Sequence, residues 1–179
     1  SGTYLDAPLR YSEGRASADT LALARLIGPI RVIDVTRACA KERDYRATVE
    51  DLREHERSHG RIPAGAAVLV RTGWGRHFEN PERYFGGPDE QHFPGLSLEL
   101  ARELVGRKVE IVGIDTASIE GGTQAETAVH RALATAEISA LENLAALEDL
   151  PTVGATLIAL PMKLKGSGGG PTRVVALVP

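Results

Sequence analysis

The sequence has little cysteine, few aromatic residues and no long hydrophobic run. Its one cysteine, Cys39, excludes an intramolecular disulfide and a metal site built from several thiolates, and it fits a reducing compartment. We therefore expect a cytoplasmic protein. No apolar run approaches the roughly 20 residues that a membrane helix needs, and the first residues do not form a signal peptide. We expect no membrane partner.

The charges are nearly balanced as well. The chain carries 21 Lys and Arg against 24 Asp and Glu, a formal net charge of −3. Without a basic excess there is no field to attract phosphate backbones, so nucleic acid is not an expected partner. The 179 residues are 42% hydrophobic, enough for one substantial core. We find no repeat or linker and expect one domain over residues 1–179.

Strand and helix patterns alternate along the chain. Residues 30–36 and 66–72 are β-branched runs bounded by Gly and Pro, which is typical of buried strands. Between them the sequence predicts a helix that Thr48 caps and Gly60 ends. Strand, helix and strand at this spacing imply a crossover βαβ unit, and so an α/β fold with a mixed sheet and flanking helices.

The second half of the chain continues this alternation. Ser97 is the expected cap of another helix, which ends at Gly106. The remaining predicted segments are a strand in 109–115, a helix over 126–134, an amphipathic segment at 142–150, and two strands in 154–164 and 172–179 joined by a Gly-rich turn.

One short stretch matches a zinc-protease motif. "HERSH" has the form H-E-x-x-H, in which His55 and His59 would bind zinc and the intervening Glu would activate water. Its neighbours are mostly charged, and burying them without partners would cost several kcal/mol each. We therefore expect a solvated helix face with two surface histidines, and we retain the zinc site as the alternative.

Polar residues recur where a small-molecule site can be assembled. The opening segment offers Tyr4, Asp6 and Arg10, and later segments offer His130 and Glu142. In α/β folds, ligands collect beyond the carboxyl ends of the strands. The alternatives are a turn role for Asp6, a surface charge for Arg10, a semi-buried packing role for His130, and a helix start at Glu142.

Three further positions are candidates for substrate binding. Trp74 follows a predicted strand, and His92 and Phe93 lie in the loop "RYFGGPDEQHFPG". Each of them could instead pack locally. Asp115 and Glu120 also follow a predicted strand and lie within reach of the same site.

Several short motifs, taken in their order, resemble the cyclase family of metal-dependent hydrolases, which includes kynurenine formamidase and isatin hydrolase. "SGTYLDAPLR" is similar to the family signature H-x-G-T-H-x-D-A-P-x-H from its second position onward. "LVRTGW", "PGLS", "VGIDTASIE" and "ENLAALEDLP" then follow in the family's order. The resemblance implies a swivelling β/β/α-type fold and a homodimer or homotetramer. It also implies strands before the signature, so we expect that this chain lacks the N-terminal strands of the family.

The resemblance also implies a set of site residues. Asp6, His130 and Glu142 match family positions that hold zinc or manganese. Tyr4 stands where the family has its second His, and Arg10 where it has the last His, which takes part in proton transfer. The first His would precede Ser1.

The two replacements change the chemistry of the implied site. The phenol of Tyr4, with an ordinary pKa near 10, must lose a proton before it binds a metal. The guanidinium of Arg10 stays protonated, so it cannot act as a base and would repel a nearby cation. We therefore expect a weakened metal site at Asp6, His130 and Glu142, or no metal at all. In the second case Tyr4, Asp6, Arg10, His130 and Glu142 would act as the catalytic groups themselves.

The function that the resemblance implies is hydrolysis. The bond cleaved would be a C–N bond, in an amide, formamide or lactam, or a lactone bond, of a small aromatic or carboxylate-bearing substrate. The alternative belongs to another class of protein: a catalytically silent protein that binds a small molecule on the same fold.

Overall fold

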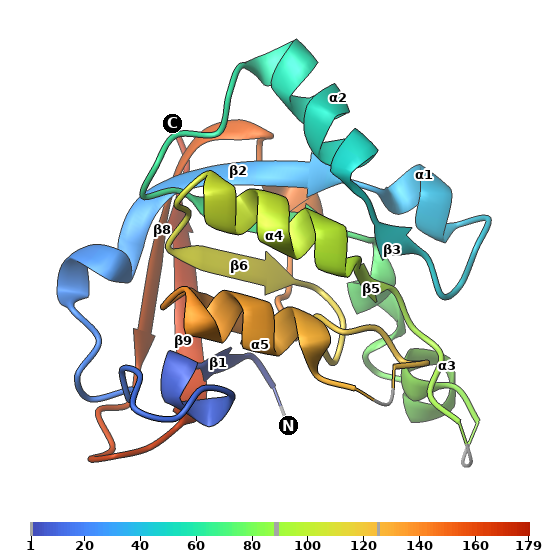
Figure 1. Cartoon of the computed structure of the whole chain (residues 1–179). Coiled ribbons are helices and arrows are strands. Elements are labelled where there is room, and N and C mark those ends of the chain that lie inside the picture. The colour runs from blue at the N-terminus through green and yellow to red at the C-terminus, as the bar shows by residue number, and fades with distance from the viewer. Residues whose placement is uncertain (1, 88–89, 125) are drawn as a thin grey trace.

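A ring of seven strands forms the centre of the computed structural model, which describes residues 2–87, 90–124 and 126–179. The strands close into a barrel in the order β1-β7-β6-β4-β2-β8-β9, and β9 pairs with β1 to complete the ring (Figure 1). Their bounds are β1 Tyr4–Asp6, β2 Ile27–Asp34, β4 Ala67–Arg71, β6 Ile111–Ile114, β7 Ser139–Glu142, β8 Val153–Pro161 and β9 Gly169–Leu177. A separate short pair joins β3 Arg46–Ala47 to β5 Gly95–Leu96.

Four neighbouring strands of the barrel run parallel. β2, β4, β6 and β7 pair in parallel, whereas β1, β8 and β9 pair antiparallel with their neighbours. A helix lies in each connection between the parallel strands, which confirms the predicted crossover units. The carboxyl ends of these four strands therefore meet at one end of the barrel.

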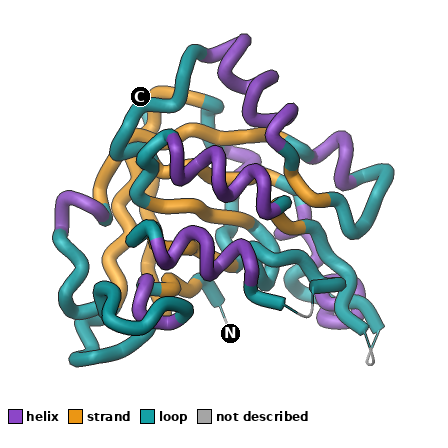
Figure 2. The backbone as a smooth tube through the Cα atoms, viewed as in Figure 1, coloured by secondary structure: helices purple, strands orange, loops and turns teal. Residues whose placement is uncertain are grey.

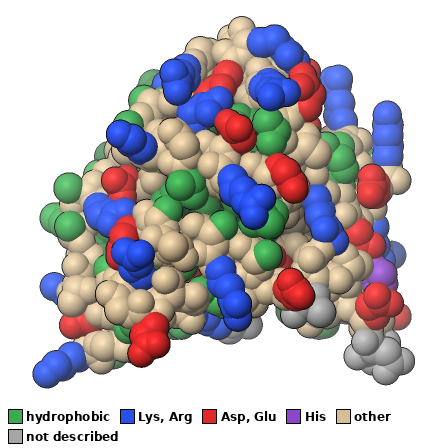
Figure 3. Space-filling model, in the orientation of Figure 1, with side chains coloured by type: hydrophobic (Ala, Val, Ile, Leu, Met, Phe, Trp, Pro, Cys, Tyr) green, Lys and Arg blue, Asp and Glu red, His purple; other side chains and the backbone are tan. Residues whose placement is uncertain are grey.

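Helices cover the outer face of the parallel strands. α2 Val49–His59, α4 Leu98–Gly106 and α5 Ala128–Thr135 lie side by side over this face (Figures 1 and 2). The predicted caps are confirmed, because Thr48 forms a capping box with Asp51 and Ser97 accepts a bond from Leu100 N. Lys and Arg alternate with Asp and Glu across this side of the molecule (Figure 3).

Shorter helical segments connect these elements. They are the α-helices α1 Thr36–Cys39 and α3 Pro81–Phe85, and the 3-10 turns η1 Pro8–Arg10, η2 Leu23–Arg25, η3 Trp74–His77 and η4 Leu147–Asp149. No helix in the described ranges is long and apolar enough to cross a membrane.

The alternation of side chains along the strands creates two cores. Leu69 and Ile111 point into the barrel, whereas Val68 and Val112, next to them in the chain, pack beneath the helices. The same alternation governs β1, where Leu5 is buried inside the barrel. Asp6, the next residue, therefore lies on the outer face, where α5 packs.

Three sequence-based expectations differ from the structure. The predicted mixed sheet is closed, because β8, β9 and β1 bridge its two edges. The segment 142–150 is not one amphipathic unit: Glu142 ends strand β7, and left-handed φ angles of 54° at Asn143 and 56° at Ala146 interrupt any helix. His55 is buried rather than on a solvated face, although His59 is exposed as predicted. N-terminal strands before residue 1 stay a prediction.

Candidate metal centre

Three side chains from distant parts of the sequence converge on the outer face of the barrel. Asp6 comes from β1, His130 from α5 and Glu142 from the end of β7. His130 Nε2 lies 3.0 Å from Glu142 Oε1 and 3.6 Å from Asp6 Oδ2. One donor atom from each residue lies within 4.8 Å of the others. We call these three residues the triad; the structure brings them together, and their role stays a prediction.

Strand pairing explains this convergence. In the antiparallel register of β1 and β7, Tyr4 lies opposite Glu142 and Asp6 lies opposite Ala140. Tyr4, Asp6 and Glu142 therefore share the outer face. Because α5 packs over that face, its buried His130 meets both carboxylates.

Glu120 holds His130 in one orientation. Glu120 Oε1 lies 2.8 Å from the backbone N of His130 and 3.0 Å from its Nδ1. An ionised carboxylate can only accept hydrogen bonds, so Nδ1 carries a hydrogen and Nε2 is left to face Asp6 and Glu142. The sequence placed Glu120 near the site without giving it this role, since nothing in the motif shows which carboxylate lies behind the histidine.

Three carboxylates surround the His130 ring. Burial lowers the pKa of His130, but the contacts with Asp6, Glu120 and Glu142 outweigh it and raise the pKa to about 10. Without another cation in the site, the imidazole is therefore protonated at neutral pH. The triad thus presents a strongly anionic environment that favours a positive charge at its centre.

The two replaced signature residues also lie at the triad. Arg10 Nη1 is 2.8 Å from Asp6 Oδ1, whereas His130 faces the other oxygen, Oδ2. Tyr4 shares the outer face, and its ring lies across Gly169, where an added Cβ would come within 2.8 Å of the ring. Arg10 Cζ is 5.2 Å from the centre of the Tyr4 ring. The structure thus joins all five predicted catalytic residues in one site.

Tyr11 covers the site from one side, which the sequence did not predict. Its ring stacks on the His130 ring with centroids 4.1 Å apart and an interplanar angle of 30°. Arg10 Cζ also lies 5.7 Å from the Tyr11 ring. The only signal in the sequence was an aromatic residue directly after the signature.

The donor set of the triad fits a divalent metal ion. One imidazole nitrogen and two carboxylates are ligands that zinc and manganese accept. Ligands about 2.1 Å from one ion lie roughly 3.0–3.4 Å apart, close to the 3.0 and 3.6 Å measured from His130 Nε2. Neither buried oxygen of Asp6 accepts a well-aligned hydrogen bond from the described part of the chain, although Oδ1 is ion-paired with Arg10. Three protein ligands leave further coordination positions open, as in catalytic sites.

The alternative zinc site in α2 does not form. The rings of His55 and His59 stack with centroids 5.1 Å apart. Within residues 2–87, 90–124 and 126–179, no Asp, Glu, Cys or further His joins them in a cluster of three ligands. Within these residues the H-E-x-x-H match therefore lacks the third protein ligand that a zinc site needs.

The predicted substrate-binding residues lie elsewhere. Trp74 and Phe93 are buried in an aromatic cluster with Tyr84, and Trp74 Nε1 donates to Tyr84 O at 2.9 Å. His92 is partly exposed, with Nδ1 2.7 Å from Asp44 Oδ2. The structure gives these side chains local partners, and their contact with a substrate stays a prediction.

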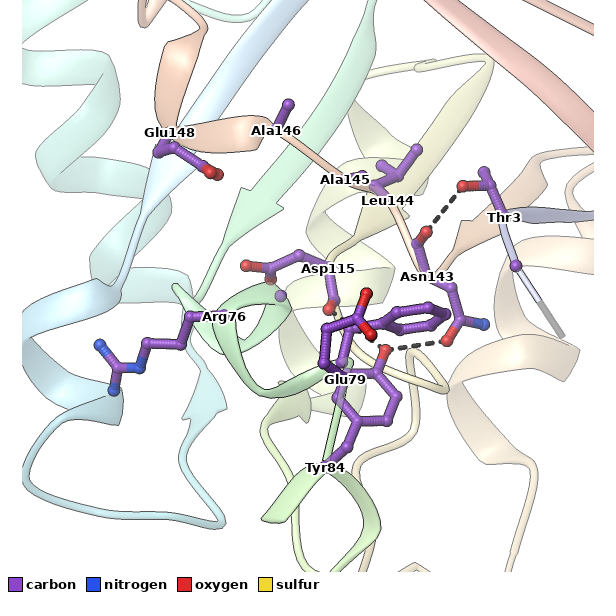
Figure 4. Close-up of a pocket in the computed structure, with 13 residues that line it drawn as sticks. Thr3, Arg76, Glu79, Tyr84, Asp115, Asn143, Leu144, Ala145, Ala146 and Glu148 are labelled. Atoms are coloured by element: carbon purple, nitrogen blue, oxygen red, sulfur yellow. Dashed lines mark hydrogen bonds between the residues drawn. The ribbon is translucent and has the colours of Figure 1, made fainter. Parts of the chain in front are cut away.

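A cavity of about 410 Å³ lies at the carboxyl ends of β4, β6 and β7 (Figure 4). The triad does not line it, but Thr3 and Asn143 do, and they are the chain neighbours of Tyr4 and Glu142. Thr3 Oγ1 donates to Asn143 O at 2.7 Å, and Tyr84 Oη donates to Asn143 Oδ1 at 2.8 Å. The cavity thus begins one residue from Glu142 of the triad on β7, and one residue from Tyr4 on β1.

Asp115 forms part of the wall of this cavity. Its carboxylate accepts bonds from Thr72 N, Thr72 Oγ1 and Trp74 N. Burial raises the pKa of Asp115 despite these bonds. The carboxylate therefore fixes the turn after β4, which is a structural task.

Comparison with known proteins places the chain in a family. A family model described as "Putative cyclase" matches residues 1–121. The chain belongs to this cyclase family. The isatin hydrolase of Roseibium aggregatum is 35% identical over 190 aligned residues, which cover the whole chain and 72% of that enzyme. The kynurenine formamidase of Bordetella pertussis is 32% identical, over 97% of the chain and 74% of that enzyme.

Solved structures agree with this assignment. Isatin hydrolase A from Labrenzia aggregata, bound to benzyl benzoate, superposes with a TM-score of 0.93 at 34% identity, over 99% of the chain and 72% of that structure. A structure described as a potential metal-dependent hydrolase with cyclase activity superposes with a TM-score of 0.73 at 30% identity, over 98% of the chain and 77% of that structure. This cyclase is accordingly an enzyme of the hydrolase class, with the fold of its family.

Proposed function

We propose that this cyclase hydrolyses a C–N bond in a small amide, formamide or lactam, using a divalent cation held by the triad. The observation that carries the proposal is the convergence of Asp6, His130 and Glu142, with one donor atom of each within 4.8 Å of the others. The names of the similar enzymes, isatin hydrolase and kynurenine formamidase, support the amide class. Zinc and manganese are the candidate ions.

Each residue has a distinct task in this proposal. A divalent cation in the triad would supply Lewis-acid polarisation of an amide carbonyl. His130 Nε2 and carboxylate oxygens of Asp6 and Glu142 would hold it. Glu120 orients the imidazole from behind, and the backbone N of Ile119 donates to Glu142 Oε1 at 3.2 Å. The chain thereby arranges its ligands before any substrate arrives.

One observation favours a second candidate. The cation Arg10 already contacts Asp6 at 2.8 Å and supplies part of the positive charge that the anionic site favours. In this variant the site works without a metal, and His130 with Glu142 acts as an acid–base pair. A metal-stripped protein that still turns over substrate would favour this candidate.

The test is turnover with and without metal. Protein stripped with a chelator is assayed on N-formylkynurenine and on isatin, before and after addition of Mn²⁺ or Zn²⁺. We expect turnover only with metal, a loss of roughly 100-fold or more in His130→Asn, and no change in His59→Asn, which alters an exposed histidine.

Two results would contradict the proposal. Equal turnover with and without metal would favour the metal-free candidate. Metal-independent binding of both compounds without turnover would indicate a silent binding protein.

A further inference from the structure

Arg10 has several partners beside the triad. Its Cζ lies 5.2 Å from the centre of the Tyr4 ring and 5.7 Å from that of the Tyr11 ring, and its guanidinium contacts Asp6. Its backbone is fixed as well, because Arg10 N donates to Ala7 O at 3.0 Å. Gly168 packs so closely that a Cβ there would lie 3.1 Å from Arg10 Cα. The positive charge is thus placed before any ligand binds.

The donors of Arg10 are not used up by Asp6. Arg10 Nη1 lies 2.8 Å from Asp6 Oδ1, but the N–H groups are not aligned for a hydrogen bond to this carboxylate. The Arg10 side chain is 44% exposed. Since a guanidinium carries five N–H donors in a planar fork, it can still bind an oxyanion from solvent.

Arg10 is also the basic side chain that pairs with the carboxylates of the site. Among the described residues, no other Lys or Arg forms an ion pair with the triad or with Glu120. Three carboxylates would repel an anionic substrate that approached without such a cation. A fixed, half-exposed guanidinium offsets that repulsion at one edge of the site.

We propose that Arg10 binds a carboxylate of the substrate, close to the scissile C–N bond. This inference rests on the proposed hydrolysis. Arg10 contacts Oδ1 of Asp6, while the other oxygen of the same carboxylate faces His130 at 3.6 Å. The guanidinium therefore contacts one oxygen of a triad carboxylate, and only the width of that carboxylate separates it from His130. A substrate carboxylate only a few bonds from the reacting carbonyl reaches Arg10, and a distant one does not.

The simpler role for Arg10 is to neutralise the buried Asp6. If Arg10 only neutralises Asp6, its removal should lower kcat/KM equally for charged and uncharged substrates. Recognition of a carboxylate predicts a loss confined to substrates that carry the anion near the amide. The two roles can therefore be separated by a matched set of substrates.

The test compares N-formylanthranilate with its methyl ester and with 4-formamidobenzoate. Hydrolysis of each breaks the formyl C–N bond, with water supplying hydroxyl to the formyl carbon and a proton to nitrogen, to release formate and an amine. We expect the metal-loaded enzyme to prefer the ortho acid. Arg10→Met should lower kcat/KM for that acid roughly 10- to 100-fold, mainly through KM, and change the other two little.

Two further variants and a binding measurement complete the test. Arg10→Lys keeps the charge without the fork and should give an intermediate loss, and Arg15→Met, which alters an exposed arginine paired with Glu137, should give none. Calorimetric binding of anthranilate should weaken about 10-fold or more in Arg10→Met, whether or not formamides are turned over.

The outcomes separate this inference from the proposed function. Equal losses on acid and ester, or unchanged anthranilate binding, would overturn the role of Arg10 and leave the hydrolysis intact. Anthranilate binding that depends on Arg10, without turnover of any formamide in the presence of metal, would support Arg10 and contradict the hydrolysis.

Discussion

Glu120 is the residue whose effect on the triad is easiest to isolate. Its Oε1 lies within hydrogen-bond distance of two atoms of His130, the backbone N and Nδ1. Glu120→Gln removes the charge that polarises the imidazole, so we expect metal affinity to fall roughly 10- to 100-fold. Calorimetric titration of Zn²⁺ measures this.

The matched control for Glu120 is Glu99→Gln, which makes the same change at an exposed position of α4. It should leave the affinity for Zn²⁺ unaltered. If Glu120→Gln also leaves the affinity unaltered, the orienting role is wrong.

Gly169 shows how closely β9 approaches the site. An added Cβ would lie 2.3 Å from Leu5 O and 2.8 Å from the Tyr4 ring. Gly169→Ala should therefore lower the free energy of unfolding by about 1–3 kcal/mol, as measured by chemical denaturation.

Gly106→Ala serves as the comparison for Gly169→Ala. Nothing lies within 4 Å of its added Cβ, and the residue is helical, so stability should stay the same or rise. Equal effects of the two variants would contradict the close approach of β9 and β1.

Among the contacts between helices, one ion pair joins α2 to the C-terminal end of α4. Arg107 Nη2 lies 2.9 Å from Glu56 Oε2, and both side chains are more than four-fifths buried. Hydrogen bonds from Arg107 hold the pKa of Glu56 below its usual range. In the unfolded chain Glu56 has the ordinary glutamate pKa of about 4.3, so the ion pair contributes its full stabilisation above that pH. The contribution is lost as the pH falls through the lower pKa of Glu56 in the folded protein.

Glu56→Gln tests this linkage. At pH 7 it should lower the free energy of unfolding by roughly 1–2 kcal/mol, and the difference from wild type should shrink below about pH 4. Glu50→Gln, in an exposed pair with Arg57 on the same helix, should have little effect at any pH. A difference that grows as pH falls would contradict the assignment.

The sequence predicted individual elements well where local signals are strong. The capping residues Thr48 and Ser97 and the β-branched runs of β2 and β4 each act within a few residues, so their patterns are readable. Ala146 adopts a left-handed backbone angle that is uncommon for alanine, whereas Asn143 has one that asparagine takes more readily than most residues. The backbone break at Ala146 was therefore not predictable from local preference.

At the scale of the whole molecule, the site depends on closure of the barrel. β1 pairs with both β7 and β9, and this pairing brings Asp6 beside Glu142 across more than 130 residues of chain. The resemblance to a family identified Asp6, His130 and Glu142. The contact of Arg10 with Asp6 and the stack of Tyr11 on His130 depend on three-dimensional placement that no motif encodes.

The assembly state is also a property of the whole molecule. A homodimer or homotetramer stays a prediction from the family resemblance, and light scattering on the purified protein measures it. A monomer at micromolar concentration would contradict that expectation.

Asp6, His130 and Glu142 are proposed to hold one metal ion together. Calorimetric titration of Zn²⁺ into metal-stripped protein, with Glu142→Gln alongside, tests this most directly. We predict one ion per chain for the wild-type protein and an affinity at least about 10-fold weaker for the variant. Absence of binding to the wild-type protein, or equal binding to both, would contradict the account.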